Sequence, residues 1–356
     1  MQSVTTFAAS LCVLLAAHPR ASLASVSVGP VPEDVKAVMG WGDLYANVFG
    51  ANIVARGVAE SKVQHAANVM ASYLDNDNDG KCDDSKVCDM LIENTAMLVM
   101  FQTSDDADEF LESADMLWYG INMMLNGEPW YQDLYGDETH PDSCAFKSAG
   151  VSTDEDCTDE FDATLEEVLH LLTSGGVSQV YEDDWGESED STFGGYMADL
   201  NGDCGNGYTH DWIDPSSDDC DGWYAYDDET CDFECLCAEG LYWSLTSLLG
   251  AQVYREDDIS HEWTLANATK LAKHAADLTA MLQDTESWSW LPANLPDGSY
   301  SGQPEEVIPY LVNYAALFLV LLLVCVVGCC GACWRLYVVK SRAKNSEGGA
   351  AKGAVV

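Results

Sequence analysis

Apolar residues recur at helical spacing in several segments of the chain, whereas the alternating pattern of a half-buried strand is scarce. Val63, Ala67 and Met70, for example, fall on one face of a helix predicted over residues 57–74. The same spacing predicts helices over 85–101, 105–125, 165–174, 236–252 and 261–283. Loops rich in Gly, Asp, Ser and Cys separate them at 137–160 and 183–232. The pattern therefore predicts a mainly α fold with long loops.

The first 24 residues depart from this pattern and predict a secretory signal peptide. Phe7 to Ala17 is an apolar run, and small residues follow it up to Ala24. An N-terminal anchor helix is the alternative, but this run is too short to span a bilayer.

A longer apolar stretch lies near the other end of the chain. No residue between Glu306 and Arg335 is charged, and residues 315–334 form a core of apolar and small side chains. About 20 such residues match the ~30 Å hydrocarbon thickness of a bilayer. We therefore expect a transmembrane helix over residues 308–334.

The charges that flank this stretch predict its orientation. Lys and Arg dominate residues 335–356, and two glutamates precede the stretch. The positive-inside rule then places a short basic tail in the cytoplasm and the N-terminus outside the cell or in a lumen. The expected protein is integral to the plasma membrane or another secretory-pathway membrane. It has an ectodomain over residues 25–283 and a juxtamembrane stalk over residues 284–307.

The charge balance is strongly acidic and bears on possible ligands. The chain has 60 acidic and 15 basic residues, a formal net charge of −45. Nucleic acid is excluded as a ligand, because phosphate binding requires cationic side chains. Repulsion of this size destabilises a compact fold unless cations screen it. The 11 Trp and 16 Tyr argue against disorder. Bound calcium or a salty medium would supply the screening.

Nine cysteines lie in the predicted ectodomain, where an oxidising compartment favours disulfides. Their spacing suggests the local pairs Cys82–Cys88, Cys144–Cys157 and Cys204–Cys220. One thiol of the cluster Cys231, Cys235 and Cys237 is then left over. Asn267 begins an N-glycosylation acceptor, which fits the same compartment. The sequence thus predicts a mainly α glycosylated ectodomain with long disulfide-laced loops, followed by one C-terminal transmembrane helix.

The stretch YLDNDNDGKCDD, residues 73–84, resembles the calcium loop of EF-hands. It lies between two predicted helices and has Gly at the sixth loop position, where the EF-hand chain turns sharply. The resemblance implies calcium ligands at Asp75, Asp77, Asp79, the backbone carbonyl of Lys81, and Asp83.

The loop departs from the EF-hand pattern at its twelfth position, which is Lys86 instead of the bidentate Glu. Asp84 or Asp89 could complete the coordination shell. With fewer ligands, we expect weak binding of the extracellular grade, with a Kd of ~10⁻⁴–10⁻³ M. The alternative is a solvated acidic turn that binds no ion.

A second candidate site lies on the predicted helix in FDATLEEVLHLLTSGG, residues 161–176. Glu166 and His170 are four residues apart, so both can reach one metal ion. The segment is similar to the H-E-x-x-H helix of zinc metalloproteases with its first His replaced by Glu. The similarity implies zinc ligands at Glu166 and His170 and a general base at Glu167. Glu239 on a later predicted helix is the candidate third ligand.

A structural explanation competes with this zinc site. Thr164 and Glu167 have the spacing of a capping box, which would give Glu167 a role at the helix start. A Glu–His pair four residues apart is also common on a solvated helix face. On that alternative, replacing His170 would be almost silent.

Two functions remain open from the sequence. The first is a single-pass type I membrane glycoprotein whose calcium-binding extracellular domain binds a protein or glycan partner. The second is a membrane-tethered, metal-dependent hydrolase that uses Glu166, Glu167 and His170. The chain has no G-x-S-x-G motif, P-loop or dinucleotide fingerprint to favour other enzyme classes.

Overall fold

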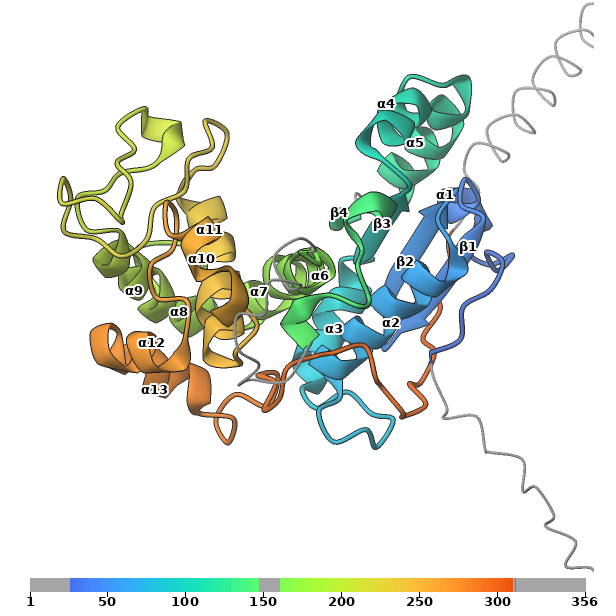
Figure 1. Ribbon diagram of the computed structural model, residues 1–356. Coiled ribbons are helices and arrows are strands. Elements are labelled where there is room, and N and C mark those ends of the chain that lie inside the picture. The colour runs from blue at the N-terminus through green and yellow to red at the C-terminus, as the bar shows by residue number, and fades with distance from the viewer. Residues whose placement is uncertain (1–25, 128, 147–160, 310, 312–356) are drawn as a thin grey trace, which may run out of the picture.

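The computed structural model describes residues 26–127, 129–146, 161–309 and 311 (Figure 1). The predicted signal peptide, the cytoplasmic tail and almost all of the predicted span at 308–334 lie outside these residues. Within the described part, none of the helices combines the length and the apolar character needed to cross a bilayer.

A four-stranded mixed sheet forms the centre of the N-terminal half. Its strands are β1 (Leu44–Val48), β2 (Ala51–Arg56), β3 (Met97–Phe101) and β4 (Tyr131–Tyr135), in that spatial order. β1 pairs antiparallel with β2, whereas β2, β3 and β4 are parallel to one another. The prediction of a mainly α fold is therefore wrong, because a sheet is the framework of this half.

Both faces of the central strands β2 and β3 are covered, which explains why these two strands lack polar alternation. Ile53 and Leu98 face the main core, together with α2 (Glu60–Leu74), α3 (Ser85–Glu93) and α6 (Thr164–Leu172). Val54 and Met97 face a second core cluster, formed with α1 (Lys36–Met39), α4 (Ser104–Leu111) and α5 (Ala114–Asn126). Strands buried on two sides are apolar along their whole length.

The C-terminal half is helical and shares the main core with the sheet. Its helices are α7 (Ser178–Val180), α8 (Glu182–Trp185), α9 (Thr192–Asn201), α10 (Phe233–Leu248), α11 (Glu256–Ile259), α12 (Ala268–His274) and α13 (Ala276–Gln283). Short 3₁₀ turns lie at Gly136–Glu138, Cys144–Phe146, Gly207–Thr209 and Val253–Arg255. Figure 1 shows α6 between the sheet and these helices. Since α6 contacts both β4 and α10, it joins the two halves, as do the contacts between α3 and α7.

Several predicted helices are shorter or divided in the structure. The segment predicted as one helix over 85–101 is α3 followed by the strand β3. The segment over 105–125 divides into α4 and α5, because the Ser113 side chain caps a new helix start. The segment over 261–283 contains α12 and α13, and the Asn267 side chain caps α12.

Disulfides occur where the cysteine spacing predicted them. Cys82–Cys88 and Cys204–Cys220 are bonded, and Cys231–Cys235 closes the third pair in the described residues. Cys237 is the leftover thiol of its cluster, and it is buried. Cys144 is also disulfide-bonded, and its predicted partner Cys157 lies outside the described residues.

Residues 284–307, predicted as a stalk, lie along the N-terminal half. The Asn68 side chain donates a hydrogen bond to the Gly298 carbonyl. Asn47 in β1 exchanges two hydrogen bonds with the backbone of Val307, at 2.9 and 3.2 Å. This segment is therefore packed against the domain for most of its length.

Candidate functional site

The helix α6 is anchored at its start by a buried aspartate. The two carboxylate oxygens of Asp162 contact different elements: Oδ2 lies 2.9 Å from His65 Nε2 on α2, and Oδ1 accepts hydrogen bonds from Thr164 Oγ1 and the His140 backbone. The N-cap is Ala163, and no side chain caps the helix. The predicted capping box of Thr164 and Glu167 is therefore not formed, and Glu167 is free for another role.

Glu166, His170 and Glu239 meet between α6 and α10. One ligand atom from each side chain lies within 4.8 Å of the others. His170 Nε2 is 3.7 Å from Glu239 Oε2. The exposed fractions are only 6% for His170 and 8% for Glu239, so the interpretation of this stripe as a solvated helix face is wrong. The structure brings together the three residues that the sequence proposed as zinc ligands.

Two atoms of this cluster are buried without a hydrogen-bond partner. They are His170 Nε2 and Glu239 Oε2, the same atoms that face one another at 3.7 Å. An unsatisfied buried polar group destabilises a protein by about 1–3 kcal/mol, and more if it is charged. A cation that accepts lone pairs from both atoms would remove this penalty.

Three neighbours orient the cluster. Glu167 Oε2 lies 3.7 Å from His170 Nδ1, so the carboxylate faces the second nitrogen of the imidazole. The Gln132 side chain on β4 donates a 2.5 Å hydrogen bond to the same Glu167 oxygen. The Tyr242 ring faces the imidazole edge-on, with 6.3 Å between the two ring centroids. Carboxylates that contact the outer nitrogen of a histidine are typical of metal sites, where they fix the tautomer.

The electrostatics of the site favour protonated carboxyls when no cation is present. Burial raises the pKa of Glu166, and the nearby Glu239 charge raises it further. Burial also raises the pKa of Glu239 to about 8. Burial lowers the pKa of His170, but the nearby carboxylates, Glu167 first, outweigh it and raise the pKa overall. Side chains with strongly shifted pKa values in a cluster are typical of functional sites.

The backbone after α6 departs from regular helix. Thr173–Val177 form a π-helical turn, a feature that is frequent at functional sites. Gly175 and Gly176 pack closely, since a Cβ on either would lie 3.0–3.1 Å from Trp130 or Val87. Within this turn, Ser174 Oγ donates a 2.6 Å hydrogen bond to Glu187. Burial raises the pKa of Glu187 to about 7.

Sequence reasoning missed Gln132, Tyr242 and Glu187. They come from β4, α10 and the segment between α8 and α9, so no local spacing connects them to the 161–176 motif. The packing of α6 against β4 and α10 reveals Gln132 and Tyr242, and the hydrogen bond from Ser174 reveals Glu187.

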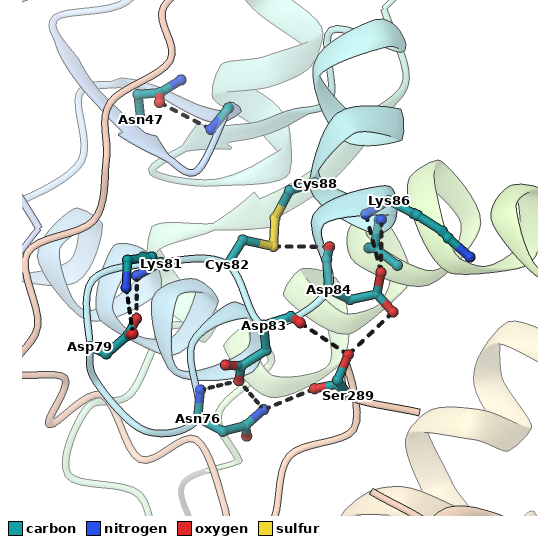
Figure 2. Close-up of a disulfide and its surroundings, with 12 residues drawn as sticks. Asn47, Asn76, Asp79, Lys81, Cys82, Asp83, Asp84, Lys86, Cys88 and Ser289 are labelled. Atoms are coloured by element: carbon teal, nitrogen blue, oxygen red, sulfur yellow. Dashed lines mark hydrogen bonds and ion pairs between the residues drawn. A yellow bond between two sulfur atoms is a disulfide. The ribbon is translucent and has the colours of Figure 1, made fainter. Parts of the chain in front are cut away.

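The acidic loop connects α2 to α3, as the calcium-loop resemblance implies (Figure 2). Asp75 is fully buried and accepts a 2.8 Å hydrogen bond from the Gly80 backbone. Gly80 has φ of +86°, a left-handed conformation that favours glycine. One oxygen from each of Asp75, Asp77 and Asp83 lies within 4.8 Å of the others. These three carboxylates can face one cation.

Other predicted parts of the loop lie elsewhere. Asp79 pairs with the Lys81 ammonium at 2.9 Å (Figure 2), outside the carboxylate group. Asp84 caps α3 and accepts a hydrogen bond from Tyr181, so its oxygens are already engaged. The Lys86 ammonium lies over the Tyr181 ring, 5.4 Å from its centroid.

The C-terminal segment covers this loop. Tyr300 donates a 2.6 Å hydrogen bond from its phenol to Asp75 Oδ2. Ser289 Oγ donates to the Asp83 carbonyl (Figure 2). A Cβ on Gly80 would lie 2.6 Å from the Gln303 carbonyl oxygen, so the C-terminal segment approaches the loop closely.

Comparison with known proteins adds no family assignment. No family model, curated protein or solved structure matches this chain.

Proposed function

We propose that this protein is a metal-dependent hydrolase of an extracytoplasmic compartment. The observation that carries the proposal is the convergence of Glu166, His170 and Glu239 with two buried, unpartnered ligand atoms. The disulfides support the compartment, because such bonds persist in oxidising surroundings.

The donor set favours a transition metal over calcium at this centre. Calcium takes six to eight oxygen ligands, whereas the centre offers one imidazole and two carboxylates. Imidazole suits zinc and iron, and carboxylates also suit manganese. Catalytic zinc sites use three protein ligands of these types. Zinc is therefore the first ion to test.

The side chains around the centre suit hydrolysis. A bound zinc ion would lower the pKa of its water to about 7. Glu167 is held by Gln132 and is partly exposed, with 21% of its side chain accessible. We assign Glu167 as the carboxylate that accepts a proton, and Tyr242 packs against the imidazole of His170. The similarity of α6 to the metalloprotease helix makes the peptide bond the first substrate class to test.

Replacing Glu167 by Gln is expected to separate metal binding from catalysis. The variant should retain one equivalent of metal per chain but lose about 10²-fold or more of the hydrolytic rate, because the amide cannot accept a proton. Metal content by mass spectrometry and cleavage of a peptide library measure the two properties. Glu234→Gln, an exposed change on α10, is the matched control that should keep both.

Two results would contradict this proposal. A purified wild-type chain without transition metal, even after incubation with zinc, would exclude the metal centre. A Glu167→Gln variant that cleaves the same peptides at the wild-type rate would exclude the assigned base.

A calcium-binding role of the acidic loop is the second candidate function. Asp75, Asp77 and Asp83 converge, and the pKa of Asp83 is raised by burial and then by the charges of Asp75 and Asp77. A cation would relieve this repulsion. Of the two sites, only the loop supports the alternative function, a calcium-stabilised domain that binds a protein or glycan partner.

Asp77→Asn/Asp83→Asn is expected to abolish calcium-dependent stabilisation. Asparagine keeps the side-chain volume and one acceptor oxygen but removes two charges from the loop. At 10 mM Ca²⁺ the wild-type chain should gain about 1–2 kcal/mol, for a Kd near 10⁻³ M. Thermal melts with and without the ion measure this gain. The matched control is Asp257→Asn/Asp258→Asn on α11, where both acids are exposed. A double loop variant that keeps the full shift would contradict the site.

A further inference from the structure

The helix α5 is unusual in this acidic chain because it carries one charge in thirteen residues, Asp115. Two of its large apolar side chains are among the most exposed in the described residues, with exposed fractions of 72% for Leu117 and 70% for Met124. Leu125 and the neighbouring Leu111 are exposed as well. A surface helix normally directs polar residues to solvent, so this outward face needs a partner.

The two sides of α5 have different environments. Its inner side chains Met116, Tyr119 and Met123 pack on the second core cluster beside the sheet. Its outer side borders an apolar groove of about 420 Å³, whose lining includes Leu111, Leu117, Ile121 and Met124. Gly120 also lines this groove. The core thus fixes α5 in place and leaves a continuous apolar face outside.

The C-terminal segment leaves the described domain beside this helix. Ile308 and Leu311 pack on the same second core cluster as the inner side of α5. The Leu311 backbone also donates a 3.3 Å hydrogen bond to the Asp34 carbonyl. Beyond Leu311 the sequence has no charge before Arg335. An uncharged stretch of that length is suited to a bilayer, and the described chain leads into it from the core cluster on which α5 packs.

We propose that the outer face of α5 lies on a zwitterionic lipid surface, next to the point where residues 312–334 enter the bilayer. The proposal rests on the predicted span and is independent of the metal centre. An in-plane helix buries its apolar side by about 5–10 Å in the interface. The exposed ring of Trp118 on α5 suits the same depth.

The charge of the chain favours lipid over a second copy as the occupant. With a formal net charge of −45, two copies repel one another, and anionic lipid repels the chain. Phosphatidylcholine has no net charge. It therefore leaves apolar burial by Leu111, Leu117 and Met124 as the main attraction.

Photocrosslinking in phosphatidylcholine vesicles tests this proposal with the full chain. A lipid with a photoreactive group near its glycerol backbone should label residues 111–131 and 312–334. It should not label residues 268–283 in α12 and α13, at the far end of the molecule from α5 (Figure 1). Leu117→Asp/Met124→Asp should reduce the label on 111–131 about fivefold or more and leave the label on 312–334 unchanged. Both side chains are exposed, so the melting temperature should be unchanged.

Three results would overturn the proposal. Label on 312–334 without label on 111–131 would place α5 away from lipid. The absence of label on 312–334 would remove the entry point. Crosslinks between the α5 helices of two chains, lost on dilution of the protein in the vesicles, would assign the face to a second copy.

Discussion

Replacing His170 by alanine is expected to remove the transition metal from the protein and to destabilise the fold. The change deletes a ligand and leaves Glu166 and Glu239 facing one another in a buried site. It also leaves a cavity against Tyr242. We expect a loss of one equivalent of metal and of about 2 kcal/mol or more in the free energy of unfolding. Metal analysis and denaturant unfolding measure the two effects.

His261→Ala is the matched control for this experiment. His261 also pairs with a glutamate, at 3.6 Å from Glu262, but 53% of its side chain is exposed. Its replacement should change stability by no more than about 0.5 kcal/mol and leave the metal content intact. Equal effects of the two substitutions, or full metal content in His170→Ala, would show that the α6 cluster is not a metal centre.

The second large effect is the pH dependence of the metal-free protein. The folded pKa of Glu239 is about 8, and those of Glu166 and Glu187 are also raised, to about 7 for Glu187. Groups with raised pKa values hold protons in the fold that the unfolded chain releases near pH 4.5. Stability is therefore greatest below pH 4.5 for these groups and decreases as pH rises through 7 and 8. We expect a decrease on the order of a few kcal/mol between pH 5 and 8.

Glu239→Gln should reduce this decrease, because the amide stays neutral over the whole range. At pH 8 the metal-free variant is expected to be more stable than the metal-free wild type, although it binds metal less well. Urea unfolding from pH 5 to 8, with and without zinc, gives the comparison. Added zinc should also flatten the wild-type profile. Glu234→Gln is the control and should keep the wild-type pH profile of stability. If the profiles of wild type and Glu239→Gln coincide, the buried Glu239 carboxyl does not cause the decrease in stability.

The sheet could not be predicted from the sequence because its central strands, β2 and β3, carry no alternating pattern. Met97–Phe101 are buried on both faces, and MLVMF continues the apolar spacing of the preceding helix. The β1–β2 turn is also unmarked, since Phe49 has a positive φ where Asn or Asp is usual in a tight hairpin. The positions of α2, α6 and α10 were predicted from apolar residues at helical spacing.

The residues of the α6 cluster could be predicted from the sequence, but their environment could not. Glu166 and His170 follow from the four-residue spacing, and Glu239 was proposed as the third ligand from a distant helix. The burial of the cluster was not visible, because α10 and β4 cover a face that looks polar in the sequence of α6 alone. In the acidic loop, Gly80 has the left-handed conformation that the EF-hand resemblance implies. The Asp79–Lys81 ion pair could not be predicted, because it depends on side-chain contacts.

The contacts of residues 284–307 have a consequence for the order of folding during synthesis. The hydrogen bond between Asn47 and Val307 joins residues 260 positions apart. The hydrogen bond between Asp75 and Tyr300 joins residues 225 positions apart. Contacts this distant in sequence form late, because long loops must close first. The N-terminal half therefore reaches its final hydrogen bonding only after the C-terminal half has emerged. A chain that stops before residue 289 would leave the buried Asp75 without the hydrogen bond from Tyr300. Its acidic loop would then be uncovered and accessible to chaperones.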